Sequence, residues 1–397
     1  MSVLPQLRLK KSNTRFLDRR HPWIFSGALQ EMREVPEEGS VVNVCDSQGD
    51  FVARGYYEIG SIAVRILTFD PDEEIDEEYW KRRLERALLL RRALGLCVPR
   101  GSYRLVHGEG DFLPGLIIDI YGDTAVMQAH TVGIHRVRQL LADTLMELYG
   151  SDLTCVYYKS ETTLPYKSDT DEREGVLSGS LHEPDCMEYG IRFVPDILKG
   201  QKTGFFIDQR ENRKLLERYS LERKVLNVFC YTGGFSLYAL RGGAQSVVSI
   251  DSSAKAIELC RTNVSLNFDA ETVGKHSALA EDAFKYLEEM PTGKFDLIVL
   301  DPPAFAKHRS VVNNALQGYR KINTEALKKI TPGGILFTFS CSQAITPQQF
   351  RQAVFTSSIA AQRKVRILHI LTQPADHPIS MYHPEGEYLK GLVLYVE

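Results

Sequence analysis

The sequence has few of the features that would place a protein in a membrane, on a secretory route or around a metal ion. Its seven cysteines are scattered and form no CxxC pair or Cys/His cluster with zinc spacing, so we expect free thiols, a reducing compartment and no metal site. No apolar run approaches the roughly 20 residues that cross a bilayer. Arg8, Lys10 and Lys11 interrupt the first residues, where a signal peptide has its apolar core. We therefore expect a cytoplasmic protein with no membrane partner.

The sequence also lacks an excess of positive charge. The formal net charge is −3, so any surface that attracts nucleic acid must be local. One basic cluster stands in the first 20 residues, where Asp18 is the one acidic residue among Arg8, Lys10, Lys11, Arg15, Arg19 and Arg20. This run is either a solvated charged face or part of an RNA-binding surface.

A chain of 397 residues, 43% of them hydrophobic, is long enough for two or three cores. The short runs VVNVCD, FVARGYY and IAVRILTF predict a small β-barrel or compact sheet. An acidic boundary follows, then a helix over about 77–95 with Leu84, Leu88 and Leu89 on one face. Mixed strand and helix signals, including a helix over about 132–149, predict a central α+β unit. We expect three domains, at residues 1–72, 73–189 and 190–397.

From about residue 190 the strand and helix signals alternate regularly. A helix follows each of the first five predicted strands, and the last two strands are expected to pair in antiparallel fashion. Seven strands in this order predict an open, doubly wound α/β sheet with a reversed last strand. The predicted strands span residues 225–230, 246–250, 277–280, 296–300, 335–340, 365–371 and 391–396.

Polar and glycine residues gather where the first predicted strands end, which is where open α/β sheets bind ligands. In CYTGGFSL (230–237), Gly233 and Gly234 would let the backbone approach a ligand at a helix N-terminus. Asp251 ends the next strand, where an acid can bind ribose hydroxyls, and Asp282 follows the third. The glycine spacing is not GxGxxG, so the pattern predicts a nucleoside cofactor and argues against a dehydrogenase. A purely structural Gly-Gly turn is the alternative.

The fourth and fifth predicted strands end in reactive side chains. Asp301 and the rigid turn Pro302–Pro303 close one strand, and Cys341 follows the other between two serines. If these two strands are parallel neighbours, the acid and the thiol lie together at the carboxyl-end edge of the sheet. We interpret this place as the reaction centre. Phe305 can stack on a planar base. The alternatives are a strand-end acid before a proline-rich loop and an inert cysteine; we interpret the competing thiol of Cys230 as packing.

Seven motifs along the chain carry a resemblance to a known family: RRHPWIFSGA (19–28), YRLVHGEGDFLPGLIID (103–119), KTGFFIDQREN (202–212), VLNVFCYTGGF (225–235), DPPAF (301–305), TFSCS (338–342) and ADHP (375–378). With them the chain resembles the ribosomal RNA large-subunit methyltransferase I family, which forms 5-methylcytosine in 23S ribosomal RNA. The resemblance implies a PUA domain for RNA, a central α+β domain and a Rossmann-like, class I S-adenosylmethionine methyltransferase domain.

The resemblance also implies roles for individual residues. Cys341 would be the nucleophile. From the rigid turn itself we expect Pro302, Pro303 and Phe305 to contact the substrate beside Asp301. Residues around S-adenosylmethionine would be Phe206, Asp208, Gln209, Arg210, Tyr231, Asp251, Asp282 and Asp301. From the glycine turn itself we expect Thr232, Gly233 and Gly234 to bind the cofactor as well.

Cytosine C5 is a poor nucleophile, so this chemistry requires covalent activation. We expect the Cys341 thiolate to add to C6 of a base that has left its stack, and Asp301 to hold the N3/N4 edge. An amino-group or guanine N7 methyltransferase, which needs no cysteine, and a catalytically silent RNA-binding protein are the alternatives. The sequence leaves open which nucleotide is modified and whether the protein is a homodimer.

Overall fold

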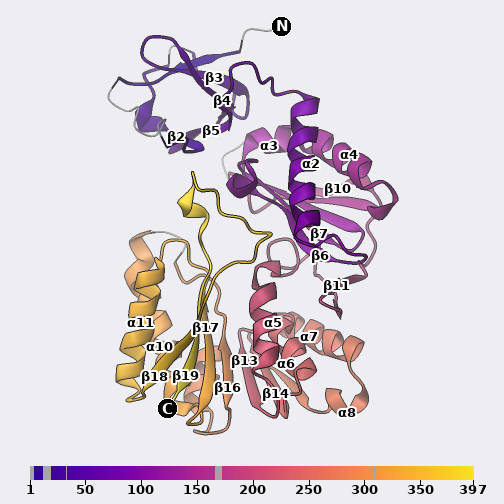
Figure 1. Cartoon of the computed structure of the whole chain (residues 1–397), viewed down its shortest axis with the longest axis vertical. Helices are drawn as coiled ribbons and strands as arrows, with labels where there is room; N and C mark the ends of the chain where they lie inside the picture. The colour runs from indigo at the N-terminus through magenta and orange to yellow at the C-terminus, as the bar shows by residue number, and fades with distance from the viewer. Residues whose placement is uncertain (1–3, 12–18, 33, 166–171, 307–308) are drawn as a thin grey trace. The chain divides into compact units, whose positions relative to one another are not determined.

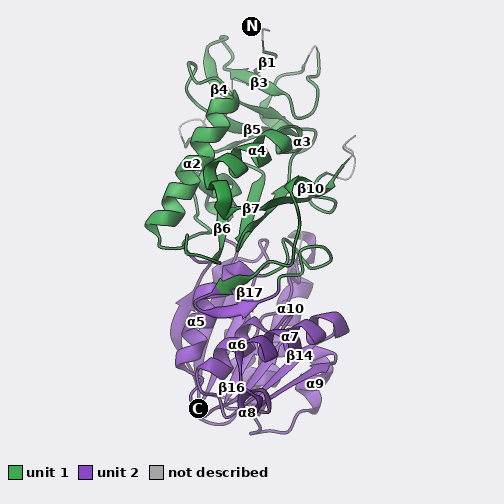
Figure 2. Ribbon diagram, turned by 90° about the vertical axis from the view of Figure 1, so that its right-hand side faces the viewer, with its two compact units in different colours: residues 1–187, 195–205, 375–386 green, residues 188–194, 206–374, 387–397 purple. Residues whose placement is uncertain are grey.

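The computed structural model describes residues 4–11, 19–32, 34–165, 172–306 and 309–397. Arg15 of the basic run lies outside this set. The chain forms two compact units, coloured separately in Figure 2. Unit 1 comprises residues 1–187, 195–205 and 375–386, and unit 2 comprises residues 188–194, 206–374 and 387–397. The first two expected domains, residues 1–72 and 73–189, therefore both contribute to unit 1, and the boundary between them stays a prediction.

The N-terminal part of unit 1 is a five-stranded sheet in the order β1-β3-β4-β5-β2. β1 pairs with β3 in parallel and the other pairs are antiparallel. Alternate side chains, such as Val42 and Val44, point into a small core. The three predicted runs form β3 (Val41–Cys45), β4 (Phe51–Tyr57) and β5 (Ile62–Thr68), and the short β1 (Gln6–Arg8) and β2 (Trp23–Phe25) complete the sheet.

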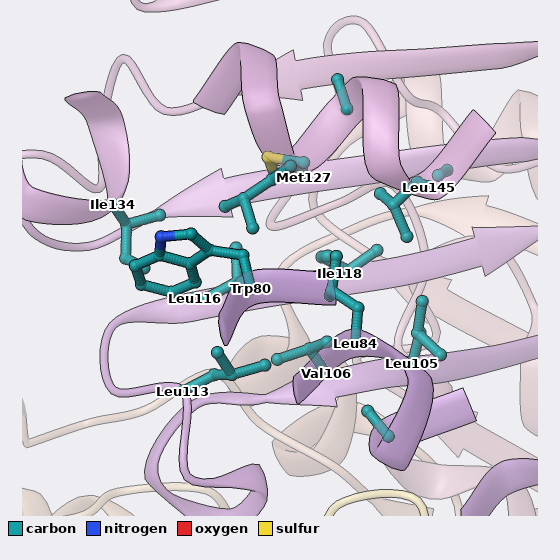
Figure 3. Close-up of a cluster of buried hydrophobic side chains, with 14 of the residues drawn as sticks. Trp80, Leu84, Leu105, Val106, Leu113, Leu116, Ile118, Met127, Ile134 and Leu145 are labelled. Atoms are coloured by element: carbon teal, nitrogen blue, oxygen red, sulfur yellow. The ribbon is translucent and has the colours of Figure 1, made fainter. Parts of the chain in front are cut away.

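A second five-stranded sheet in unit 1 has the order β10-β9-β8-β7-β6. Trp80 and Leu84 of α2 (Glu77–Ala93) pack on Leu116, Ile118 and Met127 of this sheet, as Figure 3 shows. This cluster is the main apolar core of unit 1. The strands are β6 (Ser102–His107), β7 (Leu116–Tyr121), β8 (Thr124–Ala129), β9 (Cys155–Lys159) and β10 (Glu174–Gly179).

Two details of the predicted helices in unit 1 are wrong. Leu84 and Leu88 are buried, but Leu89 is 59% exposed, because each residue turns the side chain by about 100° around the helix. The helix expected over 132–149 is two helices, α3 (Val132–Arg136) and α4 (Arg138–Tyr149). They separate at Val137, whose φ of −99° and ψ of 9° leave the helical region.

Unit 2 is built on a seven-stranded sheet in the order β15-β14-β13-β16-β17-β19-β18. The first five of these are mutually parallel, and β19 runs antiparallel to both of its neighbours, which confirms the doubly wound sheet with a reversed last strand. The strands are β13 (Lys224–Val228), β14 (Ser246–Asp251), β15 (His276–Ala280), β16 (Leu297–Leu300), β17 (Gly334–Ser340), β18 (Val365–Leu371) and β19 (Lys390–Val396).

Helices cover both faces of this sheet, as Figure 1 shows for α5 to α7 and for α10 and α11. Successive strand residues alternate between the two faces: Val225 packs with Leu216 and Leu237, whereas Leu226 belongs to the cluster of α9 to α11. The helices are α5 (Arg210–Arg218), α6 (Gly234–Arg241), α7 (Ala254–Asn267), α8 (Ala270–Val273), α9 (Ala283–Glu289), α10 (Val312–Lys329) and α11 (Pro347–Ala360).

A two-stranded sheet of β11 (Cys186–Glu188) and β12 (Ile191–Phe193) lies where the chain passes from unit 1 to unit 2. Within the described ranges, no helix combines the length and the apolar character that spanning a membrane requires.

Candidate active site

The turn after β13 has an unusual backbone. Phe229, Tyr231 and Gly233 all have positive φ angles, of 61°, 49° and 88°, and β13 therefore ends at Val228, two residues earlier than predicted. A Cβ on Gly233 would lie 2.5 Å from the Sγ of Cys260. Both the positive φ and the short distance to Cys260 therefore require glycine at this position. This requirement favours a turn with a specific role over a Gly-Gly pair of no consequence.

Asp251 ends the neighbouring strand and is hydrogen-bonded to this turn. Its Oδ2 accepts the backbone N–H of Tyr231 at 2.9 Å, and its Oδ1 accepts that of Ser253 at 2.9 Å. Each carboxylate oxygen keeps another lone pair for a ligand hydroxyl. The ring of Tyr231 stands edge-on to that of Phe206, with centroids 5.1 Å apart. Three of the predicted cofactor residues are therefore close together at this sheet edge.

The other predicted residues of this edge have structural contacts as well. Asp282 is exposed and caps α9, since its Oδ1 accepts the N–H of Lys285 at 2.8 Å. Thr232 is buried, and its carbonyl accepts a hydrogen bond from Asn263 Nδ2 at 3.0 Å. Gly234 is the first residue of α6. A cofactor role for these three stays a prediction.

The segment before α5 connects to the reaction centre through a hydrogen bond of Gln209, whose amide is held in turn by Asn212 of α5. Gln209 donates from Nε2 to Asp301 Oδ1 at 3.0 Å, and its own Oε1 accepts from Asn212 Nδ2 at 2.6 Å. Asp208 is buried and accepts from the Tyr388 hydroxyl at 2.7 Å. The amide of Gln209 is therefore oriented, and it fixes one oxygen of Asp301.

A buried ion pair that the sequence did not reveal supports the same segment. Arg213 binds Glu188 through two hydrogen bonds of 2.8 and 2.6 Å and donates from Nη1 to the Phe206 carbonyl at 2.8 Å. Arg210, which is also buried, lies 3.5 Å from Glu211. Because Arg213 and Glu188 are 25 residues apart, no local pattern predicts their pairing.

The turns after β16 and β17 meet at one place. Asp301 and Pro302 follow β16, and Cys341 follows β17, its parallel neighbour. The Cys341 Sγ lies 3.9 Å from the Pro302 carbonyl oxygen, and both Asp301 and Cys341 are partly exposed, whereas Pro302 is buried and Pro303 is exposed. The structure thus brings together the two turns that carry the predicted acid and thiol.

Ser342 and Tyr319 brace the two turns. The Ser342 Oγ accepts the N–H of Ala306 at 3.1 Å and lies 3.0 Å from the Tyr319 hydroxyl. Phe305 packs on Tyr319 with centroids 4.7 Å apart and approaches Phe284 at 6.2 Å. The Phe305 ring therefore contributes to the packing of this loop, and stacking on a substrate base stays a prediction.

Of the three cysteines in unit 2, Cys341 is the one that is partly exposed. Burial raises the pKa of Cys230, which is 6% exposed and suits the packing role that we expected. Hydrogen bonding to Cys230 and His276 lowers the pKa of Cys260, but this thiol is fully buried and out of reach of a substrate. Cys341 is thus the accessible candidate nucleophile.

Lys390, the first residue of β19, is a member of this site that sequence reasoning missed. Its side chain is buried, and its Nζ donates to the Ser342 carbonyl at 2.7 Å. Burial lowers its pKa to about 8, against the opposing effects of negative charge at Cys341 and Glu387. The signal in the sequence is weak: one lysine at the start of the apolar run GLVLYV.

Unit 1 contains a cavity of about 540 Å³ beside β5. Phe69, Phe112 and Tyr382 line it together with Arg20 and Arg83. Phe112 and Tyr382 are 51% and 45% exposed, and the Arg20 guanidinium lies 6.0 Å from the centre of the Phe69 ring. Among the described residues, no three His, Cys, Asp or Glu side chains gather as metal ligands.

Comparison with known proteins identifies the family. Residues 134–378 match the model of an S-adenosylmethionine-dependent methyltransferase, and residues 7–69 match a PUA-like domain. A Tolumonas auensis protein named ribosomal RNA large subunit methyltransferase I is 42% identical over 97% of this chain and 98% of its own. A Klebsiella pneumoniae protein of the same name is 38% identical over 100% of this chain and 99% of its own. The chain belongs to the ribosomal RNA large subunit methyltransferase I family.

Solved structures of lower identity share the fold of this family member. A Streptococcus mutans protein described as a SAM-dependent methyltransferase superposes with a TM-score of 0.82 at 20% identity, covering 99% of this chain and 100% of its own. A methyltransferase solved in complex with SAH gives a TM-score of 0.83 at 20% identity over the same shares. The cofactor of the family is S-adenosylmethionine, and the site fits it: Asp251 has free lone pairs for hydroxyls, and the glycine turn lies at the N-terminus of α6.

We predict that Gly233→Ala disrupts the cofactor turn. The substitution places a side chain in a left-handed conformation, which costs about 1–2 kcal/mol, and drives its Cβ against Cys260. Gly293→Ala is the matched control, because Gly293 has a similar φ of 74° with open space around it. Chemical denaturation should show a larger loss of unfolding free energy in Gly233→Ala than in the control, and calorimetry should show S-adenosylmethionine binding at least about tenfold weaker. Equal losses in the two variants would contradict the tight contact with Cys260.

Proposed function

We propose that this protein forms 5-methylcytosine in the 23S RNA of the large ribosomal subunit, with Cys341 as a covalent nucleophile. The observation that carries the proposal is the partly exposed Cys341 thiol beside the Asp301-Pro302 turn, with its Sγ 3.9 Å from the Pro302 carbonyl oxygen. The named relatives support ribosomal RNA as the substrate. An acid and a thiol at the same edge of the sheet are suited to methylation of cytosine C5, because C5 reacts only after a nucleophile has added to the ring.

In this mechanism the Cys341 thiolate forms a bond to C6 of the cytosine, and the electrons of the C5–C6 double bond make C5 nucleophilic. Bound S-adenosylmethionine supplies an electrophilic methyl group. When C5 takes this methyl group, the C–S bond of the donor would break and leave a neutral thioether. A base would then take the C5 proton, which restores the C5–C6 double bond and expels the thiolate. Asp301, oriented by Gln209, contacts the N3/N4 edge of the base, where charge develops during the addition.

The cofactor would be held by residues of the β13 and β14 ends. Asp251 would bind ribose hydroxyls, and Phe206 and Tyr231 would provide the aromatic wall of the site. Asp208 and Gln209 belong to the segment that Arg213 ties to the Phe206 backbone. These residues bind and orient the methyl donor, while Cys341 and Asp301 act on the base.

RNA binding would rest on unit 1. Residues 7–69 match a PUA-like domain, and the basic run lies at its start. The cavity of about 540 Å³ joins aromatic rings to two arginines, which is the combination that binds unstacked bases and their phosphates. A single-stranded segment of ribosomal RNA would fit this chemistry.

An N-methyltransferase is the second candidate. In such an enzyme the Asp301-Pro302 turn would position an amino group and the cysteine would be dispensable. The partly exposed Cys341 favours the C5 reaction, because a thiol at the mouth has no role in N-methylation.

We predict that Cys341→Ala abolishes 5-methylcytosine formation. Without the sulfur no adduct at C6 forms, so the rate should fall by at least about 10³-fold. The measurement is nucleoside mass spectrometry of 23S ribosomal RNA after incubation with the protein and S-adenosylmethionine. Cys97→Ala is the matched control and should retain activity, because Cys97 is also a partly exposed thiol but belongs to unit 1.

The outcome separates the candidates. Methyl transfer that persists in Cys341→Ala, with the product on a nitrogen, would establish the N-methyltransferase instead. Binding of RNA without binding of S-adenosylmethionine by the unaltered protein would establish the silent RNA-binding role.

We also predict that the double variant Phe112→Ala/Tyr382→Ala binds ribosomal RNA more weakly. Each stacked base contributes about 1–3 kcal/mol, so loss of one stacking site should raise the Kd about tenfold. Phe355→Ala is the control, because Phe355 is also a surface aromatic (55% exposed) but lies on α11 in unit 2. Filter binding at one fixed salt concentration gives both values. An unchanged Kd in the double variant would show that the cavity does not bind RNA.

A further inference from the structure

Lys390 is an unusual residue for its position. It is 5% exposed at the start of a strand whose other residues are apolar, and lysine is almost never buried unless it is paired. Within the described part of the chain, no carboxylate lies within 4.0 Å of its Nζ. Its hydrogen bond goes to the Ser342 carbonyl, at 2.7 Å, which satisfies one of three donors and compensates no charge.

Lys390 contacts the two residues that flank Cys341 in the sequence. Lys390 is the direct partner of Ser340 in the antiparallel β17–β19 pair, and its Nζ binds the carbonyl of Ser342. Ser342 is itself held by Ala306, whose N–H donates to its Oγ at 3.1 Å. The backbone of Lys390 is therefore paired with the residue before Cys341, and its ammonium is bound to the residue after it.

In the described part of the chain, four titratable or charged side chains face this region besides Asp301, whose turn meets that of Cys341. Glu387 precedes β19, and Arg351 of α11 lines the same small cavity as Lys390. Tyr319 of α10 lies at Ser342, and burial raises its pKa, so it is neutral near pH 7. The remaining group is Cys341, whose negative charge favours the protonated form of Lys390. That interaction is reciprocal: the ammonium favours the thiolate by the same free energy.

The thiol needs such a cation. A free cysteine has a pKa near 8.5 and is mostly protonated at neutral pH, and only the thiolate attacks. The Pro302 carbonyl, 3.9 Å from Sγ, is an acceptor and therefore favours the protonated thiol. A positive charge held at a fixed place has to outweigh this effect.

We propose that Lys390 is the positioning residue that keeps Cys341 ionised, its buried ammonium serving as the counter-ion of the thiolate; the inference rests on the proposed function of Cys341 as the nucleophile. The thiol proton passes to solvent and Lys390 keeps its own proton. When the sulfur bonds to C6 the thiolate charge moves into the ring, and when the thiolate leaves, the same ammonium receives it again. The ammonium is present below about pH 8, the pKa of Lys390 in the folded protein.

The test is the pH dependence of alkylation at Cys341 in the full-length protein, without RNA or cofactor. Iodoacetamide reacts with the thiolate, and mass spectrometry of the peptide that contains Cys341 gives its rate separately from the other cysteines. In the unaltered protein the rate should be half-maximal below pH 8. In Lys390→Met the midpoint should rise by at least about one unit, so that the rate at pH 7 falls about tenfold.

Three controls make the result specific. Lys390→Arg keeps the positive charge and should retain most of the reactivity at pH 7. Lys285→Met removes a lysine whose side chain is 71% exposed and should change nothing. The partly exposed Cys97 of unit 1 is an internal reference whose alkylation rate should be equal in all variants.

Two results would overturn the proposal. One is a Cys341 midpoint in Lys390→Met that lies within about 0.3 units of the unaltered value, in a protein whose urea unfolding is unchanged. The other is a Cys341 midpoint at or above pH 8.5 in the unaltered protein. This measurement does not depend on whether any variant folds.

The methylation rate distinguishes this inference from the proposed function. If both hold, Lys390→Met should be slow at pH 7 and should recover at pH 9, whereas Cys341→Ala should be inactive at both. Activity of Cys341→Ala would refute the nucleophile, while the alkylation midpoints would still report on the counter-ion.

Discussion

Ser342 is the residue through which the two halves of the reaction centre are joined. Its hydroxyl binds the Ala306 amide and lies at the Tyr319 hydroxyl, and its carbonyl accepts from Lys390. The loop after β16, the turn after β17 and the start of β19 therefore meet at one side chain. Because Ser342 is fully buried, losing its hydroxyl would leave the Ala306 N–H without a partner, which costs about 1–3 kcal/mol. The placement of Cys341 depends on these bonds.

The sheet explains why methyl donor and nucleophile share one edge. β13 and β14 end in the glycine turn and Asp251, while β16 and β17 end in Asp301 and Cys341. Parallel pairing brings all four ends to the same side, and Gln209 links the two regions by its bond to Asp301. The reversed strand β19 adds a feature that a purely parallel sheet could not supply, since it brings Lys390 opposite Ser340.

Features that depend on local periodicity were predictable from the sequence. The order of strands and helices in unit 2 follows from alternating apolar runs. Features that depend on a distant partner were not. Nothing near Glu188 indicates that it pairs with Arg213, and the burial of Lys390 follows from strand pairing with β17. The exposure of Leu89 shows that a run of leucines does not determine which of them faces the core.

The most direct test of the covalent mechanism is a trapping measurement. Ribosomal RNA that contains 5-fluorocytidine allows the sulfur to add to C6 and C5 to be methylated, but fluorine cannot leave as the proton does, so the adduct persists. The mechanism predicts a protein–RNA complex that survives denaturation and a peptide cross-linked at Cys341 by mass spectrometry. The mechanism would be contradicted if the fluorinated RNA gave no adduct although the same RNA without fluorine is methylated. A cross-link at another cysteine would also contradict it.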